Sequence, residues 1–137
     1  MLDLILCVDD DPITLMLCKM VINRSEFAKE LITAQNGEEA LNYFDDLKLN
    51  NLGTEIKRYP QLIFLDLNMP VMGGWEFLDH FSKEDYTAEF EHCKVIVLSS
   101  TIDPDDIAKA KTYPMVLDFL SKPISKEMLI DLKKILV

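Results

Sequence analysis

Length, composition and charge place this sequence among ordinary globular proteins and exclude several kinds of function. The 137 residues suffice for one domain with a sizeable core, which we expect to span residues 1–137. A net charge of −10, with scattered lysines and arginines, excludes the clustered basic surface that nucleic-acid phosphates require. No apolar run approaches the roughly 18 residues of a membrane span. Because Asp3 stands where a signal peptide carries positive charge, we expect a cytoplasmic protein without membrane contact.

The N-terminal part of the chain predicts a strand followed by a helix. Residues 4–8 are a short apolar run, typical of a buried strand, and they end abruptly at three consecutive acids, residues 9–11. Pro12 suits the first turn of a helix, and Asp11 is a candidate N-cap for it. The apolar positions at helical spacing are Ile13, Met16, Leu17, Met20 and Val21. One cap does not require three acids, so the first two acids have no structural task.

A second strand and helix follow, and then a long polar connection. Residues 30–34 form a weaker strand pattern, and Asn36 then marks a helix start, with Glu39 three residues later. The apolar face of this helix is expected at Ala40, Leu41, Phe44 and Leu47. Residues 48–60 are polar, so we expect a surface loop that is longer than the usual few residues.

The central feature of the sequence is an apolar run, residues 62–65, that ends in Asp66. Such a run predicts a strand buried on both faces in the middle of a parallel sheet. A carboxylate has no structural use inside this strand, but at the carboxyl end it faces the crevice where open α/β sheets bind ligands. Asp66 is therefore a candidate for chemistry, and the alternative is that it caps the following turn. A third helix is expected over residues 75–81, and the acidic stretch 82–93 either extends that helix or forms a long loop.

The C-terminal part supplies two more pairs of a strand and a helix. Residues 94–98 and 116–120 are apolar strand patterns, Asp103 and Pro104 mark a helix start, and residues 128–136 carry the stripe of a last helix. Five strands alternate with five helices, which predicts an α/β fold with a parallel sheet covered on both faces. At this size the natural architecture is a flavodoxin-like three-layer sandwich of strand order 2-1-3-4-5.

Polar side chains gather where the expected strands end. The first, third, fourth and fifth strands finish in Asp9 and Asp10, Asp66, Ser99 and Lys122. In a parallel sheet these ends share one edge, with neighbouring strands about 4.8 Å apart. Three carboxylates so close together repel one another, and each raises the pKa of the others. A bound Mg²⁺ relieves this repulsion and leaves coordination positions for phosphate oxygens. The set predicts in-line phosphoryl transfer with Asp66 as the nucleophile, and with Lys122 and Ser99 holding the phosphoryl oxygens.

Four short motifs resemble those of the receiver domain of bacterial two-component response regulators, in particular the single-domain chemotaxis type. In order along the chain they are VDDDP at residues 8–12, LDLNMPVMGG at 65–74, VLSS at 97–100 and FLSKP at 119–123. One departure is Gly73, where many members of that family have aspartate, and it leaves the phosphorylation residues intact. The resemblance implies a phosphorylation-dependent signalling switch rather than an enzyme.

The resemblance also implies roles at the phosphorylation site. Asp66 would accept a phosphoryl group from a histidine kinase or a phosphotransfer protein. Asp10, Asp66 and the backbone carbonyl of Asn68 would ligate Mg²⁺, for which Mn²⁺ can substitute, and Asp9 would hold the ion through water. Lys122 would contact the phosphoryl group, and its peptide bond to the following proline is expected to be cis.

The resemblance further implies how the signal leaves the site. Ser99 and Phe119 would form a switch pair, in which the hydroxyl moves toward a phosphoryl oxygen and the ring turns inward behind it. The alternative for Phe119 is an ordinary core or edge aromatic. The fourth helix, fifth strand and fifth helix, residues 103–136, should respond and bind an unknown downstream protein. The domain would be a monomer, or it would dimerise through this face when phosphorylated.

Two other interpretations are open from the sequence. The acids after the first strand also fit the opening of haloacid-dehalogenase-like phosphatases, with Asp9 as the nucleophile and Asp11 as the general acid. That alternative leaves Asp66 without a task, and Ile13 stands where that family has threonine or valine. The other interpretation is a receiver-shaped domain that binds partners without being phosphorylated.

Overall fold

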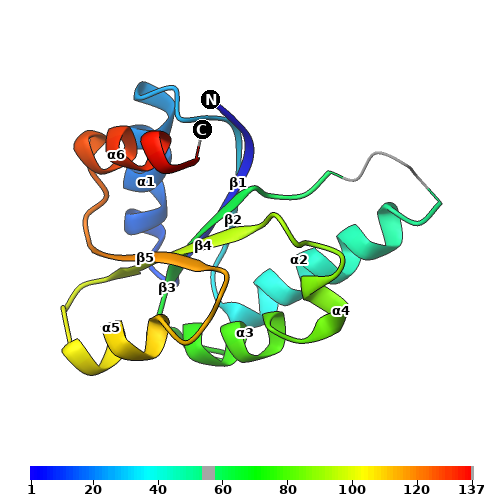
Figure 1. Ribbon diagram of the computed structural model, residues 1–137. Coiled ribbons are helices and arrows are strands. Elements are labelled where there is room, and N and C mark those ends of the chain that lie inside the picture. Colours follow the sequence, from blue (N-terminus) through cyan, green and yellow to red (C-terminus); the bar gives the residue numbers. More distant parts are fainter. Residues whose placement is uncertain (54–57, 137) are drawn as a thin grey trace.

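The computed structural model describes residues 1–53 and 58–136 and contains a five-stranded parallel sheet. The strands are β1 (Leu2–Val8), β2 (Ala28–Ala34), β3 (Leu62–Asp66), β4 (Lys94–Ser99) and β5 (Val116–Ser121). Their order in the sheet is β2-β1-β3-β4-β5 (Figure 1). The parallel pairing and this order confirm the expected flavodoxin-like architecture.

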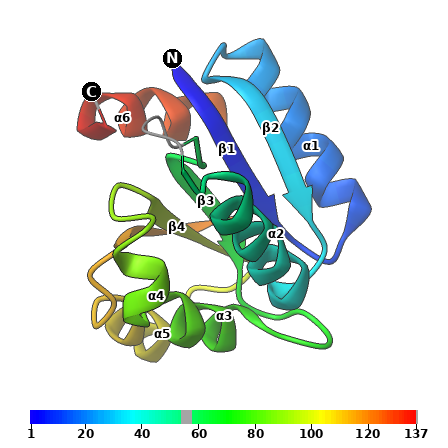
Figure 2. The ribbon, with the colours of Figure 1, turned by 90° about the vertical axis from the view of Figure 1, so that its right-hand side faces the viewer.

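Helices cover both faces of the sheet and complete three layers (Figures 1 and 2). They are α1 (Pro12–Arg24), α2 (Gly37–Asn50), α3 (Gly74–Phe81), α4 (Glu84–Thr87), α5 (Pro104–Ala110) and α6 (Lys126–Leu136). The helices α1 and α6 lie on one face, and the other four lie on the opposite face. The described part of the chain thus has six helices where five were expected. None of these described helices is long and apolar enough to cross a membrane.

Two apolar clusters form the core, one on each face of the sheet. The cluster under α1 and α6 contains Leu15, Cys18, Ile22, Leu129 and Leu132. The opposite cluster is rich in phenylalanines: Phe44, Phe77, Phe81 and Phe90. Every residue of the central strand β3 is buried, whereas the edge strand β5 is largely half-buried or exposed. The sequence reflects this difference, because β3 is continuously apolar up to Asp66 and β5 contains an exposed aspartate.

The expected N-caps begin three of the helices. Each cap side chain accepts a backbone N–H from two or three residues later, at 2.9 Å, and the residues are Asp11, Asn36 and Asp103. These bonds satisfy donors that a helix start leaves without a partner within the helix. The caps fix where α1, α2 and α5 begin, and each of these helices begins just past the carboxyl end of a strand.

The expected apolar face of α1 is wrong at four of its five positions, whereas Val21 is half-buried and packs against the core. Ile13, Met16, Leu17 and Met20 are 64, 55, 44 and 39 % exposed, and the helix instead buries Leu15, Cys18 and Ile22. The helix carries apolar residues around most of its circumference, so its sequence contains two stripes at helical spacing. Packing against the sheet selects the stripe that begins at Leu15. The Leu15 N–H donates to the Asp11 carbonyl, which is the first hydrogen bond of the helix.

The two expected loops are also partly wrong. The helix α2 continues to Asn50, so the predicted loop over 48–60 begins too early, and residues 54–57 lie outside the described residues. The stretch 82–93 is neither a continuation of α3 nor a solvated loop. It contains the short helix α4, and the centroid of the Phe90 ring lies 4.9 Å from that of the Phe44 ring in the core. Buried aromatic area therefore holds this stretch in place, a contribution that its acidic composition conceals.

The C-terminus of α1 allows a test of backbone strain. Glu26 has φ +51°, and the neighbouring Phe27 N–H donates to the Ile22 carbonyl at 3.1 Å, which is the hydrogen bond of a Schellman motif. Because left-handed φ is unfavourable for any residue with a Cβ, we expect Glu26→Gly to increase the free energy of unfolding by roughly 0.5–1 kcal/mol. Urea denaturation measures this change. Glu26→Ala keeps the Cβ and serves as the control, and an equal gain in both variants would contradict the explanation.

Candidate functional site

The carboxyl edge of the sheet brings the expected polar residues together. Asp66 ends β3, Asp9 directly follows β1, and Lys122 directly follows β5. The Lys122 ammonium donates to Asp9 Oδ2 at 2.6 Å, and it lies 3.1 Å from Asp66 Oδ1. Strands far apart in the sequence thus place one cation between two carboxylates.

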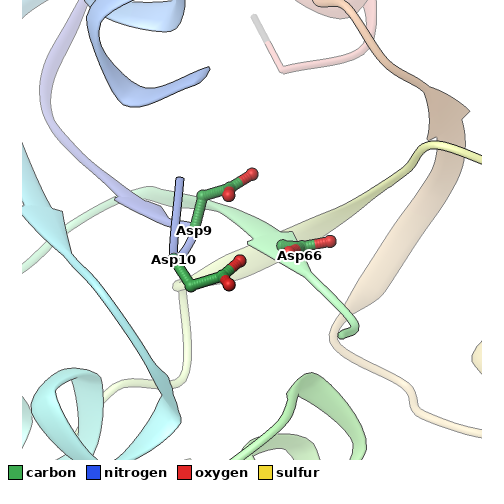
Figure 3. Close-up of side chains that lie close together, drawn as sticks. All are labelled: Asp9, Asp10 and Asp66. Atoms are coloured by element: carbon green, nitrogen blue, oxygen red, sulfur yellow. The ribbon is translucent and has the colours of Figure 1, made fainter. Parts of the chain in front are cut away.

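Asp10 completes a group of three carboxylates (Figure 3). One oxygen from each of Asp9, Asp10 and Asp66 lies within 4.8 Å of the others. Asp9 and Asp66 are 5 and 6 % exposed, whereas Asp10 is open to solvent. The cluster therefore has a buried side, where Lys122 lies, and an accessible side from which a ligand can enter.

The electrostatics of the site favour a further cation. Burial raises the pKa of Asp66, the charge of Asp9 raises it further, and Lys122 opposes both effects. Burial alone would lower the pKa of Lys122, but its hydrogen bond to Asp9 and the charges of both carboxylates raise it. Lys122 therefore stays charged, and three ionised carboxylates beside one ammonium leave two negative charges. Carboxylate oxygens are the ligands that Mg²⁺ prefers, so these side chains fit a divalent magnesium ion.

Backbone hydrogen bonds fix the orientation of these side chains. Asp9 Oδ1 accepts the Asp11 N–H at 2.9 Å, and the Asp9 N–H donates to the Ala34 carbonyl at 3.0 Å. The Lys122 N–H donates to the Ser99 carbonyl at 2.8 Å. The peptide bond between Lys122 and the following proline is cis, as expected. The position of Lys122 thus depends on the end of β4 as well as on the carboxylates.

The turn after Asp66 is packed more closely than the sequence indicates. A Cβ on Gly74 would lie 2.5 Å from the Asp66 carbonyl oxygen, and the Gly74 N–H donates to the Leu67 carbonyl at 2.9 Å. The Gly37 N–H, at the start of α2, donates to the Met72 carbonyl at 2.8 Å. In the sequence Gly74 is only part of a turn signal, and its contact with Asp66 becomes visible only when α3 is in place.

The remaining expected residues lie near the cluster but outside it. Ser99 is buried, and its hydroxyl accepts the Thr101 N–H at 3.3 Å. Phe119 is half-buried on β5, pairs in register with Val97, and packs against the phenylalanine-rich cluster. Asn68 is exposed in the turn that follows Asp66. The structure therefore places the expected switch pair on the adjacent strands β4 and β5.

Fold and site together define a receiver domain of two-component signalling. The chain belongs to the response regulator receiver domain family, whose match covers residues 5–134. This agrees with the class to which the four motifs pointed. The phosphatase alternative gains no support, because its general acid, Asp11, is used as the cap of α1.

Similar proteins and structures come from several organisms. The probable methanogenesis regulatory protein FilR2 of Methanothrix harundinacea is 29 % identical over 131 residues, which are 96 % of this chain and 77 % of that protein. The chemotaxis protein CheY of Listeria monocytogenes is 26 % identical over 127 residues, covering 93 and 92 % of the two chains. The chain spans only 47 % of a response regulatory protein of Staphylococcus epidermidis. The crystal structure of a two-component response regulator from Cytophaga hutchinsonii has a TM-score of 0.85 at 30 % identity, covering 98 and 96 %.

The charge balance of the cluster predicts that Asp66 destabilises the metal-free fold. We expect Asp66→Asn to increase the free energy of unfolding by about 1 kcal/mol at neutral pH in excess chelator, because it removes one of three crowded charges. A raised pKa means that ionisation of Asp66 costs stability as the pH rises through the folded-state pKa. The gain should therefore be smaller at mildly acidic pH.

Urea denaturation at the two pH values measures this difference. Asp3→Asn is the matched control, since Asp3 forms an exposed pair with Lys29 and its loss should change stability little. A less stable Asp66→Asn protein would mean that the attraction between Asp66 and Lys122 outweighs the repulsion among the carboxylates.

Proposed function

We propose that the chain is a phosphorylation-dependent switch in which Asp66 accepts a phosphoryl group from a histidine kinase or a phosphotransfer protein. The observation that carries this proposal is a buried carboxylate, Asp66, that contacts the Lys122 ammonium and lies in one cluster with two further carboxylates. A buried acid beside a cation, in a cluster that is open to solvent at Asp10, suits a nucleophile for phosphorus.

The residues have distinct tasks in the proposed transfer. A bound Mg²⁺ would neutralise charge on the phosphoryl oxygens, and Asp10, Asp66 and the Asn68 carbonyl would hold it, with Asp9 acting through water. An Asp66 carboxylate oxygen forms the new bond to phosphorus as the bond to the donor histidine nitrogen breaks. The Lys122 ammonium, now shared between two carboxylates, turns to a phosphoryl oxygen and keeps its charge throughout. Mn²⁺ can take the place of Mg²⁺.

The proposed output uses Ser99 and Phe119. The Ser99 hydroxyl turns from the Thr101 N–H to a phosphoryl oxygen, and the Phe119 ring moves toward the space behind it. A two-state rearrangement of this kind is biased only by the different affinity of its two states for the phosphoryl group. The face formed by α5, β5 and α6 then binds a downstream protein or a second copy of the domain.

The phosphoacceptor is tested by incubating the protein with acetyl phosphate and Mg²⁺ and mapping the adduct by mass spectrometry. We expect the adduct on Asp66, its loss in excess chelator, and a rate at least roughly tenfold lower in Asp10→Asn. Asp3→Asn, which changes an exposed acid far from the site, is the control. An adduct on Asp9 would support the phosphatase instead, and full phosphorylation without a divalent ion would contradict the role of the cluster.

The switch is tested by amide hydrogen exchange with and without beryllofluoride, which mimics the phosphoryl group. We expect exchange to change across residues 103–136 in the wild-type protein. In Ser99→Ala we expect Asp66 to be phosphorylated more slowly and the change in exchange to shrink, because the hydroxyl can no longer bind the phosphoryl oxygen. Identical exchange in both states of the wild-type protein would show that the switch is wrong even if Asp66 is the acceptor.

A further inference from the structure

The helix α5 is held weakly by the core. Of its seven residues, all of which the structure describes, only Ala110 is buried, and the others include three charged side chains. The helices α1 and α6, by contrast, bury several aliphatic side chains against the sheet. Since α5 buries so little apolar area, other contacts must fix its position.

Those contacts come from α3. The rings of Trp75 and Tyr113 are stacked, with centroids 5.9 Å apart and an interplanar angle of 20°. The Lys109 ammonium, on α5, lies 4.5 Å from the centroid of the Trp75 ring. The Tyr113 hydroxyl, just after α5, donates to Asp79 Oδ1 at 2.5 Å. We call these four residues the α3–α5 clasp.

The Asp79 hydrogen bond of the clasp persists at physiological pH. Burial of the hydroxyl, and then the hydrogen bond and charge of Asp79, raise the pKa of Tyr113 to about 12. The hydroxyl therefore remains a donor, beside the Lys109 ammonium that lies over the Trp75 ring. The clasp thus combines a stacked pair, a cation–π contact and a charged hydrogen bond at the boundary between α3 and α5.

One end of the clasp is tied to the proposed phosphoacceptor. Trp75 directly follows Gly74, which packs against the Asp66 carbonyl so closely that no Cβ fits between them. The first turn of α3 is therefore fixed to the backbone of Asp66. The contacts of the clasp hold Lys109 and Tyr113 in place relative to α3. They thereby also hold α5 and the start of β5.

The N-terminal end of α5 follows a loop that is hydrogen-bonded to the Ser99 side chain. The Thr101 N–H donates to the Ser99 hydroxyl, and residues 100–103 lead directly into α5. A Ser99 hydroxyl that turns to a phosphoryl oxygen gives up this hydrogen bond. The loop then loses this hydrogen bond to β4, and α5 depends more on the clasp and on the burial of Ala110.

We propose that the α3–α5 clasp opposes the phosphorylated state by holding α5 in its unphosphorylated position. This regulatory role rests on the proposed function of Asp66. Because coupling is reciprocal, a change that opens the clasp also favours phosphorylation of Asp66. The strength of the clasp then sets how readily the face formed by α5, β5 and α6 responds.

Two variants open the clasp in different ways. Tyr113→Leu removes both the stacked ring and the hydrogen bond to Asp79, whereas Lys109→Met removes only the cation of an exposed side chain and should leave folding intact. The matched control is Tyr86→Leu. Tyr86 makes the same kinds of contact between α4 and α2, with a hydroxyl bond to Asp45 at 2.7 Å and Lys48 over its ring at 3.9 Å.

Amide hydrogen exchange and the affinity for beryllofluoride in the presence of Mg²⁺ test the proposal. In both clasp variants we expect exchange over residues 104–113 of the unphosphorylated protein and the beryllofluoride affinity to rise, the affinity roughly fivefold or more in Tyr113→Leu. Tyr86→Leu should affect exchange only near α4. Because Trp75 is the sole tryptophan of the sequence, we also expect its fluorescence to change when beryllofluoride binds the wild-type protein.

The outcomes separate this proposal from the proposed function. Wild-type protein that is not phosphorylated on Asp66 contradicts the proposed function and with it the regulatory role of the clasp. Normal wild-type phosphorylation, with an unchanged beryllofluoride affinity in both Tyr113→Leu and Lys109→Met, contradicts the clasp alone. Faster exchange without a higher affinity has the same meaning, because the clasp would then hold α5 without any coupling to Asp66.

Discussion

The site depends on the repulsion among carboxylates that the parallel sheet forces together. Because β1 and β3 are neighbours, Asp9, Asp10 and Asp66 must lie at one edge, and the only lysine that contacts them within the described residues comes from the far side of the sheet. Lys122 reaches the carboxylates because its N–H is bonded to the Ser99 carbonyl at the end of β4. The pairing of β4 with β5 therefore places the Lys122 ammonium at the site. Both the carboxylates and the lysine depend on the correct order of the strands.

The turn after β3 connects this charged cluster to the helices on one face of the sheet. Gly74 lets α3 begin against the Asp66 carbonyl, and Met72 accepts a hydrogen bond from the first residue of α2. Neither contact involves the side chain of Asp66, so the backbone of the site is held independently of its charge. The Asp66 carboxylate instead contacts Lys122, whose backbone N–H donates to the Ser99 carbonyl at the end of β4.

The sequence predicted the features that local chemistry dictates. Continuous apolar runs identified β1, β3 and β4, and parallel topology then brought Asp9, Asp66 and Lys122 together without any knowledge of side-chain packing. The face of α1 could not be predicted, because two apolar stripes share one helix and only the sheet selects between them. The core role of Phe90 was hidden for a similar reason, since an acidic, polar stretch surrounds a single aromatic whose partners lie far away in the sequence.

The helix α5 is held by a different kind of interaction from the helices α1 and α6 on the opposite face of the sheet. The helices α1 and α6 are held by aliphatic burial, which involves many side chains and has no direction. The helix α5 is held mainly by a few oriented contacts, each worth roughly 0.5–1.5 kcal/mol. A coupling energy of roughly 1–3 kcal/mol, typical of allosteric proteins, is comparable to the sum of such contacts but small beside the burial under α1 and α6. A phosphoryl group on Asp66 would therefore shift α5 and the adjacent β5 while the opposite face keeps its packing.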